Sequence, residues 1–130
     1  MEDHLDINYE FRNDFSIFQV NTRRATVDLA PEIREKLISE INHGNGQIII
    51  NLSYVEFIDS SFLGALVAGL KIVRARKGNI ALVELHPHVQ NTMALTHMDK
   101  IFPIYHTIEE AMRNLSLADS SDDSESASPL

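Results

Sequence analysis

Two adjacent serines, Ser60 and Ser61, are the residues whose side chains and position could support a chemical modification. Asp59-Ser60-Ser61 separates an apolar run, residues 47–52, from a run with helical apolar spacing, residues 61–77. A hydroxyl at the start of a helix can cap it by accepting a hydrogen bond from a free backbone amide. The same amides and the positive end of the helix dipole also favour a phosphate. The residues alone therefore leave two interpretations open, a helix cap or a site of modification.

Two other groupings suggest chemistry, and both are weaker. His86-Pro87-His88 resembles half of a metal site, but the chain has no cysteine and no third ligand stands nearby in the sequence. Because zinc sites need three or four ligands, a surface loop at a helix start is the favoured interpretation. The second grouping is Ser61 with a distant histidine and aspartate, which could form a hydrolase triad. Ser61 lacks the Gly-x-Ser-x-Gly pattern of a hydrolase nucleophile, and the sequence places no candidate histidine beside it. We therefore expect no metal, no cofactor and no enzymatic activity.

The elements that must position these residues follow from hydrophobic periodicity. Strands are predicted over residues 6–11, 15–20, 47–52, 79–85 and 101–105. Helices are predicted over residues 29–43, 61–77, 87–96 and 107–115. The first two strands meet at Asn13-Asp14, a turn-favouring pair, and residues 21–25 are predicted to be a polar link. From the third strand on, strands and helices alternate, which implies a parallel sheet with crossover helices.

Composition limits the partners and the location of the chain. The 130 residues are 44% hydrophobic, enough for one domain with a core. Residues 119–130 hold four acidic residues and no basic one, so they carry −4 of the net charge of −8. We expect this segment to be a disordered tail. The remainder is mildly acidic, which argues against direct nucleic-acid binding. No apolar run approaches the roughly 20 residues of a membrane helix, so we expect a cytoplasmic protein without membrane contact.

Three stretches carry a family resemblance. They are "IIINLSYVEFIDSSFLGALV", "KGNIALVELHPHV" and "LTHMDKIFPIYHTIEEAM". The run from Val27 to Met112 that contains them resembles the STAS domain family, and within it the bacterial anti-sigma factor antagonists. The resemblance implies an α/β fold, a mixed sheet of about five strands with about four helices packed mainly on one side. The STAS domain would span residues 1–118, followed by the tail at 119–130.

The resemblance also implies a regulatory cycle. In this family the unphosphorylated antagonist binds an anti-sigma factor that is also a serine kinase of the GHKL ATPase type, which frees the sigma factor. The kinase then phosphorylates the antagonist, which is released, and a metal-dependent serine phosphatase removes the phosphate. The family's phosphoacceptor corresponds to Ser61 here, with Ser60 as the second choice.

The family motif implies a partner-binding surface as well. Its residues would be Asp59, Ser60, Ser61, Phe62 and Leu63. Family members usually have glycine where this chain has Phe62, so its ring either contacts the partner or folds back onto the core. The alternative function is a phosphorylation-independent STAS scaffold or adaptor in a signalling assembly, or one that controls a non-transcriptional output such as secretion.

Overall fold

The structure, a computed structural model, describes residues 6–115. The proposed domain boundary at residue 118 and the acidic segment 119–130 lie outside the described residues. The strands are β1 (Ile7–Arg12), β2 (Phe15–Val20), β3 (Arg24–Ala25), β4 (Gln47–Asn51), β5 (Phe57–Ile58), β6 (Asn79–Val83) and β7 (Ile104–Tyr105). The helices are α1 (Ala30–Asn42), α2 (Ser60–Ala75), α3 (Pro87–Leu95), a 3₁₀ turn (Met98–Lys100) and a C-terminal helix over residues 108–115.

Five strands form the main sheet in the order β1-β2-β4-β6-β7. β1 pairs with β2 in antiparallel fashion, and the other neighbours are parallel, so the sheet is mixed. The hairpin between β1 and β2 turns at Asn13 and Asp14, whose φ angles are 53° and 70°. Asn and Asp tolerate this left-handed backbone better than most residues, which is why the pair marks a tight hairpin. The predicted hairpin and the mixed sheet are confirmed.

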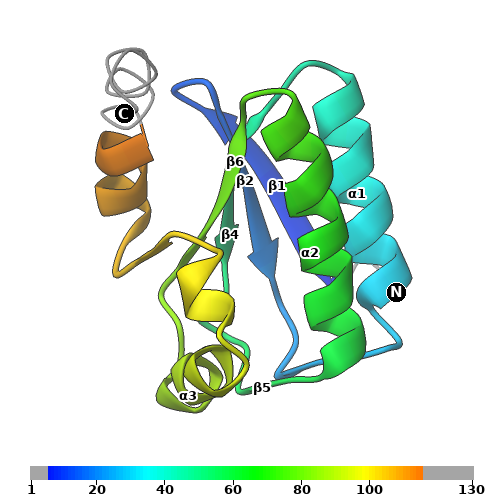
Figure 1. Ribbon diagram of the computed structural model, residues 1–130, viewed down its shortest axis with the longest axis vertical. Coiled ribbons are helices and arrows are strands. Elements are labelled where there is room, and N and C mark those ends of the chain that lie inside the picture. The colour runs from blue at the N-terminus through cyan, green and yellow to red at the C-terminus, as the bar shows by residue number, and fades with distance from the viewer. Residues whose placement is uncertain (1–5, 116–130) are drawn as a thin grey trace, which may run out of the picture.

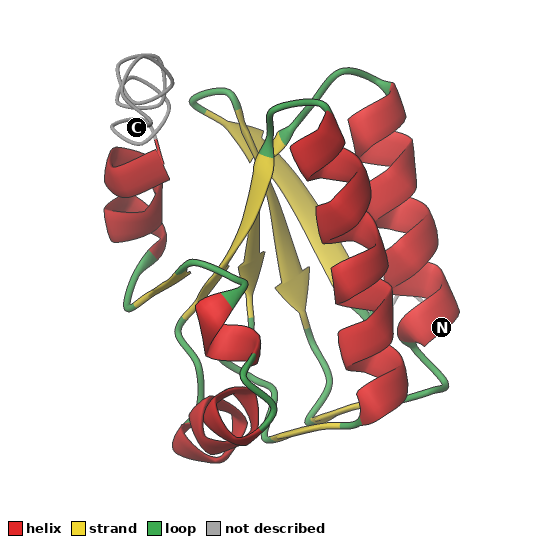
Figure 2. Cartoon of the chain, in the orientation of Figure 1, coloured by secondary structure: helices red, strands yellow, loops and turns green. Residues whose placement is uncertain are grey.

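Helices cover the two faces of the sheet unequally (Figures 1 and 2). The side chains of Ile48 and Ile50 on β4 join one core with α1, α2 and α3, whereas Ile49 points to the opposite face. There it packs in a smaller core that includes Ala111 and Leu115 of the C-terminal helix. This alternation explains why β4 is a continuous apolar run, since both of its faces are buried. The prediction of four helices mainly on one side is confirmed.

A second, two-stranded sheet was not predicted. β3 lies within the segment expected to be a polar link, and it pairs in parallel with β5. The carbonyl of Arg23 accepts the backbone N–H groups of Glu56 and Phe57 at 2.8 and 3.1 Å. The predicted strand over residues 101–105 also shortens to β7, because the chain first completes the 3₁₀ turn. Two-residue strands carry no periodicity, so only tertiary pairing reveals them.

Candidate functional site

Asp59 builds the start of α2. Its backbone is extended (φ −102°, ψ 175°), and its Oδ1 accepts the backbone N–H of Phe62 at 2.9 Å. It is therefore the N-cap, so a serine cap, one of the two interpretations that the sequence left open, is not observed. Ser60 and Ser61 are the first and second helical residues, and both are exposed. Among residues 6–115, no side-chain hydrogen bond involves either hydroxyl, so both are free to react.

The small sheet explains why Asp59 takes the capping position. Its backbone N–H donates to the carbonyl of Ala25 at 3.1 Å, which extends the pairing of β3 with β5 by one residue. Its second carboxylate oxygen, Oδ2, accepts the backbone N–H of Val27 at 2.9 Å. Both oxygens of Asp59 are thus held by backbone amides, one from α2 and one from the segment that leads into α1. The carboxylate fixes the junction on which the serines stand.

Phe62 and Leu63 serve the core. The exposed fraction of Phe62 is 0% and that of Leu63 is 8%. Both belong to the apolar stripe of α2, which continues through Leu66, Leu70 and Val73. The third and fourth positions of α2 face the sheet, so these two side chains are covered in the described fold, and their contact with a partner stays a prediction. The interpretation of Phe62 as a core residue, left open by the sequence, is the one observed.

An open hollow lies beside the serines, between the first turns of α1 and α2. It is lined by Ala30, Pro31, Arg34, Ser60, Ser61, Gly64 and Ala65. Small side chains make most of its wall, and among the described residues that line it Arg34 alone is charged. Sequence reasoning missed Arg34, because nothing in the sequence shows that α1 packs beside α2. The hollow lies at the end of the sheet where the parallel strands finish, which is where α/β proteins commonly meet their ligands.

Loss of the Asp59 cap should destabilise the fold measurably. We expect Asp59→Ala to lower the free energy of unfolding by about 1–2 kcal/mol, because a lost N-cap costs that much. The free energy of unfolding of Asp59→Asn should fall between those of Asp59→Ala and the parent chain. Asparagine has one carbonyl oxygen and can accept only part of the original set of hydrogen bonds. Urea denaturation gives the values, and Ser60→Ala is the matched control, expected within about 0.5 kcal/mol of the parent. If Asp59→Ala equals that control, Asp59 does not act as the cap.

The two histidines form a local cap of their own. Nδ1 of His86 accepts the backbone N–H of His88 at 3.2 Å at the start of α3. The two rings stack with their centroids 5.3 Å apart and an interplanar angle of 10°. Within the part of the chain that the structure describes, no three His, Asp or Glu side chains group so as to hold a metal ion. The pair therefore has a structural role at the beginning of α3.

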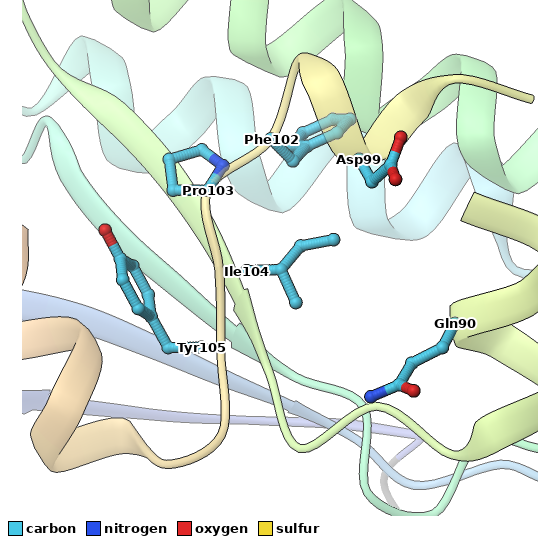
Figure 3. Close-up of a pocket in the computed structure, with 6 residues that line it drawn as sticks. All are labelled: Gln90, Asp99, Phe102, Pro103, Ile104 and Tyr105. Atoms are coloured by element: carbon cyan, nitrogen blue, oxygen red, sulfur yellow. The ribbon is translucent and has the colours of Figure 1, made fainter. Parts of the chain in front are cut away.

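A second hollow lies at the β7 edge of the main sheet, and it offers little chemistry. Gln90 of α3 and Asp99 of the 3₁₀ turn lie near the segment Phe102–Tyr105, which forms one wall. Figure 3 shows Tyr105 on the other side of this segment from Gln90. The polar side chains here do not form a catalytic pair or a ring of like charge.

Of the helices within residues 6–115, none is long and apolar enough to cross a membrane.

Known proteins share the sequence pattern and the fold of this chain. A Thermotoga maritima protein assigned as an anti-sigma factor antagonist is 34% identical over 108 residues, which cover 82% of this chain and 95% of the relative. A crystal structure of such a protein from the same species superimposes with a TM-score of 0.80 at 33% identity, covering 85% of this chain and 94% of that one. The phosphorylated form of the Bacillus cell fate determinant SpoIIAA shares the fold, with a TM-score of 0.65 at 20% identity and coverage of 83% and 97%. The sequence profile of the STAS domain matches residues 6–111. The chain belongs to the STAS domain family.

Proposed function

We propose that this protein is an anti-sigma factor antagonist of a partner-switching cascade, controlled by phosphorylation of Ser61. One observation carries the proposal: both serines at the start of α2 are exposed, and neither hydroxyl bonds within the described fold. Since Asp59 does the capping, the hydroxyl of Ser61 can be modified without removing a bond that holds the helix. The T. maritima relative supports the antagonist role, because it is assigned that role and aligns over most of its length.

Phosphorylation would act through charge at a close interface. A phosphate adds about −1.5 to −2 charge and three acceptor oxygens at Ser61, a side chain that carries no charge before modification. Burying that charge against a partner without compensation is costly, so the complex dissociates. No refolding of the antagonist is needed. SpoIIAA has been solved in its phosphorylated form, which supports the view that this fold accommodates the modification.

The family resemblance gives the partners in this proposal. The unphosphorylated protein binds an anti-sigma factor that is a serine kinase of the GHKL ATPase type. That kinase transfers phosphate to Ser61, with Ser60 as the second choice, and a metal-dependent serine phosphatase removes it. The proposed contact surface comprises Asp59, Ser60, Ser61, Phe62 and Leu63. Burial of the Phe62 and Leu63 side chains supports a surface centred on the first three residues. The protein acts in the cytoplasm and has no catalytic activity.

The proposal is tested in cells that contain the protein's own partners. The native chain, Ser61→Ala and the control Ser60→Ala are purified, their intact masses are measured, and any phosphate is mapped. We expect phosphate on Ser61 of the native chain and of Ser60→Ala, none on Ser61→Ala, and an ATPase-type kinase enriched on Ser61→Ala. Absence of phosphate under every growth condition, with the same copurifying proteins on all three chains, would instead favour the phosphorylation-independent scaffold.

A further inference from the structure

We propose that Arg34 of α1 holds the phosphate of phospho-Ser61 in an intramolecular ion pair across the hollow between α1 and α2. The inference rests on the proposed function in that it takes Ser61 as the modified residue. It adds a residue that neither the sequence motif nor the family resemblance includes. Arg34 would be a positioning residue for the phosphorylated state and would have no part in the core of the fold.

Helical spacing places the two side chains on facing surfaces. Arg34 follows Ala30 by four residues, and Gly64 follows Ser61 by three, so each pair shares a face of its helix. These faces line the same hollow. Figure 1 shows α1 and α2 lying side by side and beginning at the same end of the molecule, and the two helices are in direct contact. Arg34 and Ser61 therefore border the same open space.

The hollow has room for a phosphate. Gly64 lies one turn beyond Ser61, and a Cβ built on it would meet nothing within 4 Å. Glycine in a helix interior costs up to about 1 kcal/mol relative to alanine, so its presence here is not explained by helix stability. Gly69, one and a half turns further, is different, because a Cβ there would approach Cδ1 of Leu37 at 2.9 Å. The helices thus pack tightly at Gly69 and leave space at Gly64.

Arg34 is available to take the charge. Within residues 6–115, it forms no ion pair and no side-chain hydrogen bond, and its side chain is exposed. The carboxylate of Asp59 already accepts two backbone amides. Glu32, on the same helix, pairs with Lys36 at 3.9 Å. No acid of the described fold therefore pairs with Arg34, and it remains an uncompensated cation beside Ser61.

The chemistry of arginine suits this role. A guanidinium offers a planar fork of donors that matches two phosphate oxygens at once, which a lysine cannot do. On phosphorylation the charge lining the hollow would change from +1 to roughly −0.5 to −1, given the charge of phosphoserine. A partner that binds the unmodified surface would lose an accessible cation and meet an anion in the same step. Phosphorylation of Ser61 would thus change the charge that a partner meets at two side chains, Ser61 and Arg34.

The test installs phosphoserine at position 61 during translation, so that no kinase is required. The second ionisation of the phosphate is followed by ³¹P NMR in three phosphorylated full-length proteins. They are the parent, called the full chain below, and its variants Arg34→Gln and Lys36→Gln. We expect the pKa of the phosphate to be lower in the full chain than in Arg34→Gln by about half a unit, because a nearby cation favours the dianion. Lys36→Gln removes the same charge from the same helix outside the hollow, and it should leave that pKa within about 0.1 unit of the full chain.

A further variant distinguishes the bidentate hydrogen bonding of a guanidinium from the effect of a positive charge alone. Arg34→Lys keeps the cation and should recover part of the pKa shift. Equal pKa values in the full chain and Arg34→Gln, or an equal shift in Lys36→Gln, would overturn the ion pair. Thermal unfolding of the unphosphorylated variants, expected to match the parent, shows that each one folds. Because this measurement needs no partner, it can disprove the ion pair while Ser61 remains the phosphorylation site in cells. It can equally confirm the ion pair while the cellular experiment finds no phosphate on Ser61.

Discussion

Ser61→Ala protein will stay bound to its kinase in the presence of ATP, whereas the native chain will be released. The substitution removes the proposed phosphoacceptor and leaves the fold intact, because the Ser61 side chain is exposed and its hydroxyl bonds to nothing in the described structure. Even when Arg34 pairs with the phosphate, a net negative charge remains at the interface. A buried charge without a partner costs about 3–5 kcal/mol, so phosphate should weaken the native complex by a factor of about 100 or more. The measurement is the fraction of kinase retained on immobilised antagonist before and after ATP addition.

Two further variants make this result specific. Ser60→Ala removes the neighbouring hydroxyl and should be released like the native chain. Ser61→Glu should weaken binding without ATP, but by less than phosphate does, because one carboxylate carries less charge and has fewer acceptor oxygens. If Ser61→Glu binds as tightly as the native chain and ATP releases neither, charge at this position does not control the complex.

Gly78→Ala will cause the largest loss of stability among the single methyl additions considered. A Cβ at Gly78 would lie 2.2 Å from the carbonyl oxygen of Gly46 and 2.6 Å from Cγ2 of Val73. The first contact is with backbone, so the loop before β6 or the loop before β4 must move. Overpacking of this kind costs about 1–3 kcal/mol, and we expect a value near 3 because the clash involves backbone. Urea denaturation gives the free energy of unfolding.

Gly64→Ala is the matched control, since it adds the same methyl group. Nothing lies within 4 Å of a Cβ at this position, and alanine is the better helix former. We expect it to raise the free energy of unfolding by up to about 1 kcal/mol. Two variants with opposite signs would confirm the packing described for α2 and its exit loop. A loss of stability in Gly64→Ala equal to that in Gly78→Ala would show that the packing differs from this description.

The long elements could be predicted because their signals are local. The run Gln47–Asn51 is apolar on both faces, and the stripe of α2 repeats with helical spacing. The cap of α2 was harder to identify. Asp59, Ser60 and Ser61 are all good N-cap residues, so preference alone cannot choose among them. The choice falls to Asp59 because its backbone pairs with Ala25, a contact that no local pattern contains.

The remaining features depend on contacts between distant segments. β3 and β5 are two residues long, which is too short for alternation to be visible. Phe62 could pack inward or outward until the first turn of α2 was placed against the sheet. Arg34 lies on a different helix from Ser61, and only the packing of α1 beside α2 brings the two to one hollow. The motif was therefore visible in the sequence, but its cap, its buried half and its neighbouring cation were not.

The most direct test of the account is the affinity of the kinase for the two chemical states of the antagonist. Unmodified chain and chain carrying phosphoserine at position 61 are titrated into the purified kinase by calorimetry, and circular dichroism checks that both fold alike. The account predicts association of the unmodified chain and binding weaker by a factor of about 100 or more for the phosphorylated one. Affinities within a factor of about two of each other, with both chains folded, would contradict it.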